Sequence, residues 1–126
     1  SIYTQTKYAA LSAPIPIASG VEAQLILAEA QGASGGGVAT LNALRARPGV
    51  GLPALTAAEQ ADFQNTAYEE RRRELFLQGS RWFDLRRGNL PLTPPVNAPY
   101  PKGGSYGDQR CWPLPDAERF ANPNIG

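Results

Sequence analysis

Side chains capable of acid–base chemistry or ion pairing gather in one stretch, residues 68–87, which reads YEERRRELFLQGSRWFDLRR. Glutamates and arginines stand there directly beside large apolar residues such as Leu75 and Trp82. Three kinds of chemistry follow from that mixture. The carboxylates could act as catalytic acids, the arginines could form a basic patch, or the two signs could pair with each other inside the fold.

Catalysis by these carboxylates is not favoured. Carboxylates that cleave glycosides face each other across a cleft, about 5–9 Å apart. Within residues 69–74 the glutamates instead share one expected helix with arginines, and a neighbouring guanidinium keeps a carboxyl ionised and unsuited to act as a general acid. The absence of histidine also argues against a zinc or haem site. We therefore predict a chain that is not an enzyme and carries no metal or cofactor.

A nucleic-acid or membrane partner is not indicated by the charge of the chain. The 12 basic and 11 acidic residues give a formal net charge of +1, which creates no overall field to attract a polyanion. No apolar run approaches the ~20 residues of a membrane helix. The glycine-rich GGSYG at 103–107 lacks the helix and the lysine of a phosphate-binding loop, and the single Cys111 has no partner for an internal disulfide.

Two interpretations of the charge pattern remain open. Pairs three or four apart, such as Glu69 and Arg72, are typical of a solvated helix face, where each exposed pair contributes only a few tenths of a kcal/mol. The alternative places Arg71, Glu74 and Arg81, which flank apolar residues, in a paired network inside the domain. Arginine suits that role because its planar guanidinium binds a carboxylate through two hydrogen bonds and stays charged.

Aromatic residues of the C-terminal part form a second group of candidates. Exposed tyrosine and tryptophan faces can stack on sugar rings, so Tyr100, Tyr106 and Trp112 are weak candidates for ligand binding. A loop that needs anchoring would use the same side chains as plugs against the helices. We favour the plug interpretation for these three residues.

The elements that must position these groups are helices. They are expected over residues 21–31, 38–47, 57–77 and 81–87, with one further turn from Asp116 to Phe120. Thr56 and Glu59 form a capping box at the start of the long third helix, Gly79 ends it, and Ser80 caps the next one. Before these helices, Pro14 and Pro16 indicate an extended lead-in.

The predicted fold class is all-α, with tetratricopeptide-like helix pairs and a long Pro/Gly-rich C-terminal loop region packed on them. We expect a single domain over residues 1–126. It consists of an extended lead-in at 1–20, a helical core at 21–87 and a loop-rich tail at 88–126, where frequent prolines exclude long elements. Helix pairs of this size are the repeating unit of tetratricopeptide folds, whose period is about 34 residues.

Four stretches in order resemble the SusD/RagB family of outer-membrane nutrient-binding lipoproteins. They are EAQLILAEA (Glu22 to Ala30), LNALRAR (Leu41 to Arg47), ERRRELFLQGSRWFDLRR (Glu70 to Arg87) and PLPDAERFANPN (Pro113 to Asn124). The third and fourth together are specific, whereas helices containing AEA are common. Gln78 replaces a glutamate, and Ser19 an arginine, that are usual in the family.

The resemblance implies a helical scaffold that covers a TonB-dependent transporter of the SusC-like type and captures oligosaccharides or peptides through its loops. It implies a location on the extracellular face of the cell outer membrane, through a lipid anchor that lies outside this chain. Because family members run to several hundred residues and this sequence lacks methionine, we expect a C-terminal part of a longer protein. The alternative is a free-standing helical module for protein–protein interaction or a subunit of a surface assembly.

Structural roles are the only ones that the resemblance transfers to individual residues. It implies that Trp112 to Pro115 closes over a polar network. That network comprises Arg73, Glu74, Arg81, Asp84 and Arg86.

Overall fold

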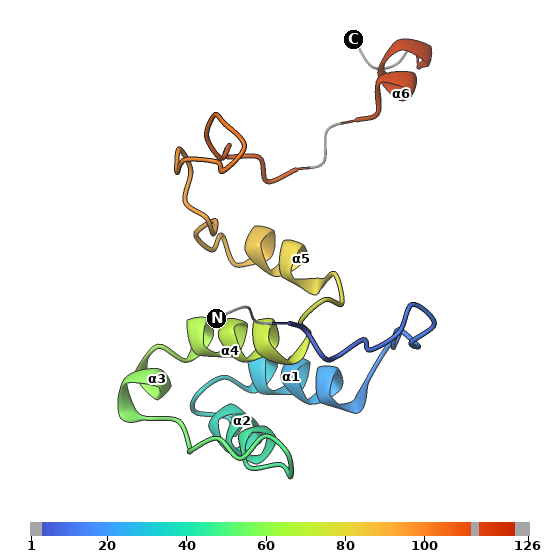
Figure 1. The fold of residues 1–126 in the computed structure, drawn as a ribbon. Coiled ribbons are helices and arrows are strands. Elements are labelled where there is room, and N and C mark those ends of the chain that lie inside the picture. Colours follow the sequence, from blue (N-terminus) through green and yellow to red (C-terminus); the bar gives the residue numbers. More distant parts are fainter. Residues whose placement is uncertain (1–3, 112–113, 123–126) are drawn as a thin grey trace. The chain divides into compact units, whose positions relative to one another are not determined.

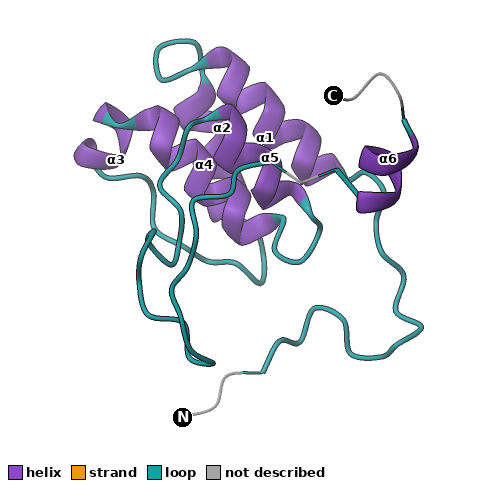
Figure 2. Ribbon diagram, turned by 90° about the horizontal axis from the view of Figure 1, so that it is seen from above, coloured by secondary structure: helices purple, strands orange, loops and turns teal. Residues whose placement is uncertain are grey.

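The computed structural model describes residues 4–111 and 114–122. Their helices are α1 (Gly20–Gln31), α2 (Gly37–Arg45), α3 (Ala57–Ala61), α4 (Phe63–Glu74), α5 (Ser80–Arg87) and α6 (Asp116–Ala121) (Figure 1). In this described part of the chain no strand forms, and one isolated antiparallel bridge joins Pro99 to Ser105 (Figure 2). The predicted all-α fold class is confirmed.

Contacts within the chain define two compact units, Ser1–Arg81 and Trp82–Gly126. The first unit contains the helices from α1 to α4, and the second contains most of α5, the tail and α6. The expectation of one domain over residues 1–126 stays a prediction.

Helix α1 has a defined signal at each end. The Ser19 hydroxyl accepts a hydrogen bond from the Glu22 amide at 3.1 Å, which satisfies one of the free amides of the first turn. At the other end Gly32 adopts a φ of 65°, and its amide donates to the Ala28 carbonyl. The residue that departs from the family pattern at position 19 therefore serves as the helix cap.

Gly37 allows α1 and α2 to approach closely. It is the buried first residue of α2, and a Cβ atom at this position would lie 2.5 Å from the Ala28 carbonyl oxygen and 2.6 Å from Cζ of Phe63. Both distances are shorter than any side chain tolerates, so only glycine fits between the three elements. Helix α2 begins at Gly37, one residue before the predicted start, and ends at Arg45, two residues before the predicted end.

The prediction of a single helix over 57–77 is wrong, because the helix is interrupted at Asp62. The capping box of Thr56 and Glu59 forms as predicted, but Asp62 adopts φ −104° and ψ 49°, which separates α3 from α4. Asp62 instead accepts two hydrogen bonds from the Asn65 amide group, and the Thr66 hydroxyl donates to the Glu59 carbonyl at the break. Short polar side chains thus compete with the helix for its backbone groups.

The end of α4 also differs from the prediction. The helix stops at Glu74, three residues early, and Leu77 and Gly79 follow with φ values of 60° and 78°. These left-handed residues turn the chain toward α5, whose first residue is Ser80. The predicted turn at Asp116 is present and extends to Ala121 as α6.

The hydrophobic core of the first unit lies where α1, α2 and α4 pack on one another (Figure 1). Its buried members are Leu25, Ala28, Leu41, Leu44, Leu55, Phe63, Ala67 and Leu75. The α1–α2 pair is the expected helix hairpin, while its likeness to a tetratricopeptide unit stays a prediction. This three-helix core fixes the faces of α2 and α4 on which the charged groups lie.

Candidate functional site

A buried carboxylate, Glu70, lies at the centre of the charged region. Its residue is 4% exposed, and the facing Arg45 of α2 is 6% exposed. Glu70 Oε1 accepts hydrogen bonds from Arg45 Nη1 at 3.0 Å and from Arg73 Nη1 at 2.8 Å. Arg45 also donates from Nε to the Pro53 carbonyl at 2.7 Å and from Nη1 to Glu59 Oε1 at 3.3 Å. The guanidinium thereby joins α2, the loop before α3, and α4.

A second ion pair lies one helical turn further along α4. Arg47 Nη2 donates to Glu74 Oε1, and Arg47 Nε donates to the Leu44 carbonyl at 2.9 Å. This pair is less enclosed, since the arginine side chain is 32% exposed and the glutamate side chain 22%. We refer to the two pairs with their neighbours as the α2–α4 ion-pair cluster. It comprises Arg45, Arg47, Glu59, Glu70, Arg73 and Glu74.

Two of the five predicted network residues, Arg73 and Glu74, belong to this cluster. Arg81 Nη2 lies 3.8 Å from Glu69 Oε1 at a partly exposed position outside it. In α5 the buried Asp84 accepts a hydrogen bond from Arg87 at 3.0 Å, and Arg86 is exposed. The single five-residue network, with the segment closing over it, stays a prediction; Trp112 and Pro113 lie outside the described residues.

The sequence did not lead us to predict Arg45, Arg47 or Glu70 as members of a network. For Arg45 and Glu70, however, the helical spacing indicated a buried position. Arg45 follows the buried Leu41 by four residues, so it falls on the apolar face of α2. Glu70 follows the buried Ala67 by three residues and falls on the apolar face of α4. Opposite charges on two apolar faces predict a buried pair, whereas the predicted networks drew only on residues 71–86 and included no residue of α2.

Glu59 serves the cap and the cluster together. Its pKa lies below its usual value, chiefly because it accepts hydrogen bonds from the Thr56 amide at 2.7 Å and from the Thr56 hydroxyl at 2.8 Å. Arg45 lowers the pKa of Glu59 further by its charge. The carboxylate is therefore held ionised, which suits pairing and does not suit proton donation.

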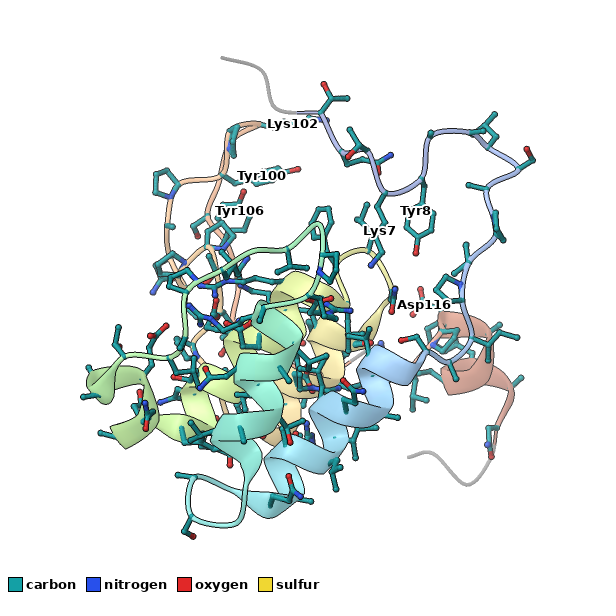
Figure 3. The ribbon with its side chains drawn as sticks, turned by 90° about the horizontal axis from the view of Figure 1, so that it is seen from below. Lys7, Tyr8, Tyr100, Lys102, Tyr106 and Asp116 are labelled. Carbon is teal, nitrogen blue, oxygen red and sulfur yellow. The ribbon has the colours of Figure 1, made fainter. Side chains whose placement is uncertain are left out.

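A cleft of about 490 Å³ opens beside the cluster within the first unit. One wall is the end of α4, with Glu70, Arg73 and Glu74, followed by Phe76. The other walls are residues 4–7 and the loop at 50–52. Lys7 fixes the first of these segments, because its Nζ donates to the carbonyls of Glu74 at 3.0 Å and Phe76 at 2.9 Å (Figure 3). Its positive charge stands at the C-terminal end of α4, where the helix dipole favours it.

The candidate tyrosines of the second unit lie together on one loop (Figure 3). The Tyr100 and Tyr106 rings meet edge to face, with centroids 5.2 Å apart. Backbone hydrogen bonds from Tyr106 to Ala98 and from Tyr100 to Gly104 hold the loop in a hairpin. Tyr100 is 42% exposed and Tyr106 is half-buried. Each ring therefore covers part of the surface of the other. The third candidate, Trp112, is outside the described residues, and the ligand-binding and plug interpretations stay predictions.

These features define a helical scaffold in which ion pairs join α2, the segments that follow it and α4, beside an open cleft. Among residues 4–111 and 114–122, no helix has both the length and the apolar composition needed to cross a membrane. In the same residues no three His, Cys, Asp or Glu side chains gather in a group suited to a metal ion.

The SusD family model matches residues 21–125, which is most of the chain, and the chain therefore belongs to the SusD family. No curated protein and no solved structure was matched in the comparisons. The matched region begins one residue after the start of α1. It includes both arginines of the LNALRAR stretch and the three glutamates with which they pair.

Proposed function

We propose that this chain is part of a non-enzymatic nutrient-binding protein on the extracellular face of the outer membrane. The protein binds an oligosaccharide or a peptide and hands it to a TonB-dependent transporter of the SusC-like type. The observation that carries the proposal is membership of the SusD family over residues 21–125. In this proposal the protein is attached to the membrane through a lipid anchor.

The geometry of the ion-pair cluster supports a binding scaffold. Glu70 and Glu74 are each paired with an arginine from outside their own helix. The cluster joins α2, α4 and the loop at 53, so its main consequence is a rigid scaffold. A rigid scaffold keeps neighbouring loops in place for a ligand and reduces the entropy lost on binding.

Two measurements on the protein that contains this chain test the proposal. Affinity purification from outer membranes should recover a TonB-dependent transporter, and an array of glycans and peptides should identify a ligand whose chemical structure is unchanged after incubation. Recovery of a different partner with no ligand bound would favour the free-standing interaction module. Turnover of the ligand that is lost on Glu70→Gln or Glu74→Gln substitution would contradict the non-enzymatic assignment.

A further inference from the structure

We propose that the cleft beside α4 is a subsite for a neutral saccharide. We call it the α4 cleft; the residues used below are Thr6, Lys7, Glu70, Arg73, Glu74 and Phe76, all of which line it. The proposal rests on the proposed function, because it names a ligand class and a place for it within this chain. The volume of about 490 Å³ lies inside the range of about 300–1,000 Å³ found for small-molecule sites.

Unused hydrogen-bond acceptors are the first argument. The Glu70 side chain is only 5% exposed, yet both of its hydrogen bonds go to Oε1, and Oε2 accepts none from the described residues. Glu74 likewise pairs through Oε1 and leaves Oε2 without a donor among the described residues. Neither Oε2 atom is among the described side-chain atoms that are buried without a partner, so both oxygens remain accessible to a small molecule. Both residues line the cleft, so a bound hydroxyl group would supply the missing donors.

The local charge selects a neutral ligand. Within the cluster the carboxylates are compensated by Arg45, Arg47 and Arg73, so a cationic ligand meets several positive charges close by. Lys7 already places an ammonium on the carbonyls at the end of α4, where a ligand amine would otherwise bind. An anionic ligand would be repelled by the carboxylates of Glu70 and Glu74, which line the cleft. A polyhydroxylated ligand avoids both conflicts.

The remaining groups of the cleft fit a sugar ring. Arg73 is half exposed and uses one terminal nitrogen for Glu70, which leaves further N–H donors for ligand hydroxyls. The Thr6 hydroxyl, on the opposite wall, can donate or accept. Phe76 is 50% exposed and offers an apolar face for the C–H side of a pyranose. Polar groups around one aromatic face provide orientation and contact area together.

The test measures binding of neutral oligosaccharides of α-glucan, β-glucan, xylan and mannan by isothermal titration calorimetry, with the full chain and its variants. Phe76→Ala should weaken the binding of the preferred oligosaccharide about tenfold. Lys7→Met, which releases the wall at residues 4–7, should weaken it at least about threefold. Phe83→Ala is the matched control, because Phe83 is a similarly exposed phenylalanine, 66% accessible, that does not line this cleft. Circular dichroism confirms that each variant folds.

Three outcomes decide between the inference and the proposed function. Selective loss in Phe76→Ala and Lys7→Met, with Phe83→Ala unchanged, supports the subsite. Unchanged affinity in both cleft variants, with a saccharide still bound by the parent chain, overturns the subsite and leaves the proposed function standing. If none of the four oligosaccharide classes binds the parent chain, the saccharide subsite is overturned, while a peptide ligand found on the array would still uphold the proposed function.

Discussion

Removal of the Glu70 carboxylate is the sharpest test of the ion-pair cluster. In Glu70→Ala, Arg45 keeps its hydrogen bonds to the Pro53 carbonyl and to Glu59, but it loses its most buried partner. Breaking a buried pair by deleting one side costs about 3–5 kcal/mol, because the other charge remains in the interior. Since Glu59 is 33% exposed and compensates part of that charge, we expect about 3 kcal/mol.

Urea denaturation followed by far-ultraviolet circular dichroism measures this loss. With a denaturant slope of about 2 kcal/mol/M, a loss of 3 kcal/mol lowers the midpoint by about 1.5 M. The control is Glu69→Ala, which removes the same side chain from the same helix. Glu69 and its partner Arg72 are 43% and 48% exposed, so this substitution should cost less than about 1 kcal/mol.

A double-mutant cycle measures the energetic coupling between Arg45 and Glu70 separately from the effect of each substitution on its own helix. Replacing both partners, as in Arg45→Met with Glu70→Leu, leaves no uncompensated buried charge and should cost clearly less than the sum of the two single substitutions. The reasoning is refuted if Glu70→Ala costs no more than Glu69→Ala. Additive single costs in the cycle would likewise show that the two residues are not energetically coupled.

Three further predictions concern local features of the fold. Gly37→Ala should destabilise the chain by about 2 kcal/mol in urea denaturation, because its Cβ meets backbone and Phe63, whereas Gly20→Ala, with open space around it, should not. Ser19→Ala should cost about 1 kcal/mol by the same assay, since it removes the α1 cap. Thr56→Ala should raise the pKa of Glu59 toward its usual 4.5 in an NMR titration of the carboxyl carbon. Because folding depresses that pKa, the stabilisation from Glu59 is present above pH 4.5 and is lost as the pH falls below it.

Element type was predictable from the sequence wherever a local signal was strong. The capping box at Thr56 and Glu59 satisfies helix amides within one turn, so it forms independently of the rest of the fold. Leu41 and Leu44 are three residues apart and so lie on one face of α2, and both are buried in the core. These signals depend on residues within a few positions of each other, which is the range that spacing can describe.

Local side-chain hydrogen bonds and one long-range contact lie at the two places where the prediction of the long helix was wrong. At the break, Asp62 accepts hydrogen bonds from the nearby Asn65 side chain, and the Thr66 hydroxyl donates to the Glu59 carbonyl. The end of α4 at Glu74 depends on Lys7, which lies far away in the sequence and donates to carbonyls at that end. The contact from Lys7 is the part of this information that no pattern within residues 57–77 contains.

Partners in the ion-pair cluster were hidden for the same reason. Charges at positions 69–74 balance within the helix, so neither interpretation of them required a partner from residues 38–47. In the structure Glu70 and Glu74 pair with Arg45, the last residue of α2, and with Arg47, which follows that helix. The LNALRAR and ERRREL stretches are therefore two halves of one interaction, and each is interpretable only beside the other.

An exchange of charges between Arg47 and Glu74 tests this reciprocity. Glu74 is the last residue of α4, where the helix dipole disfavours a carboxylate, so Arg47 offsets an unfavourable position. Arg47→Glu should therefore cost about 2 kcal/mol, because it sets a second carboxylate against that helix end. Glu74→Arg should cost less, since the dipole favours the new cation. The double exchange should recover most of the stability lost in Arg47→Glu, measured by urea denaturation. Equal costs for the two single substitutions, with no recovery in the double variant, would mean that the pair is a surface contact without structural consequence.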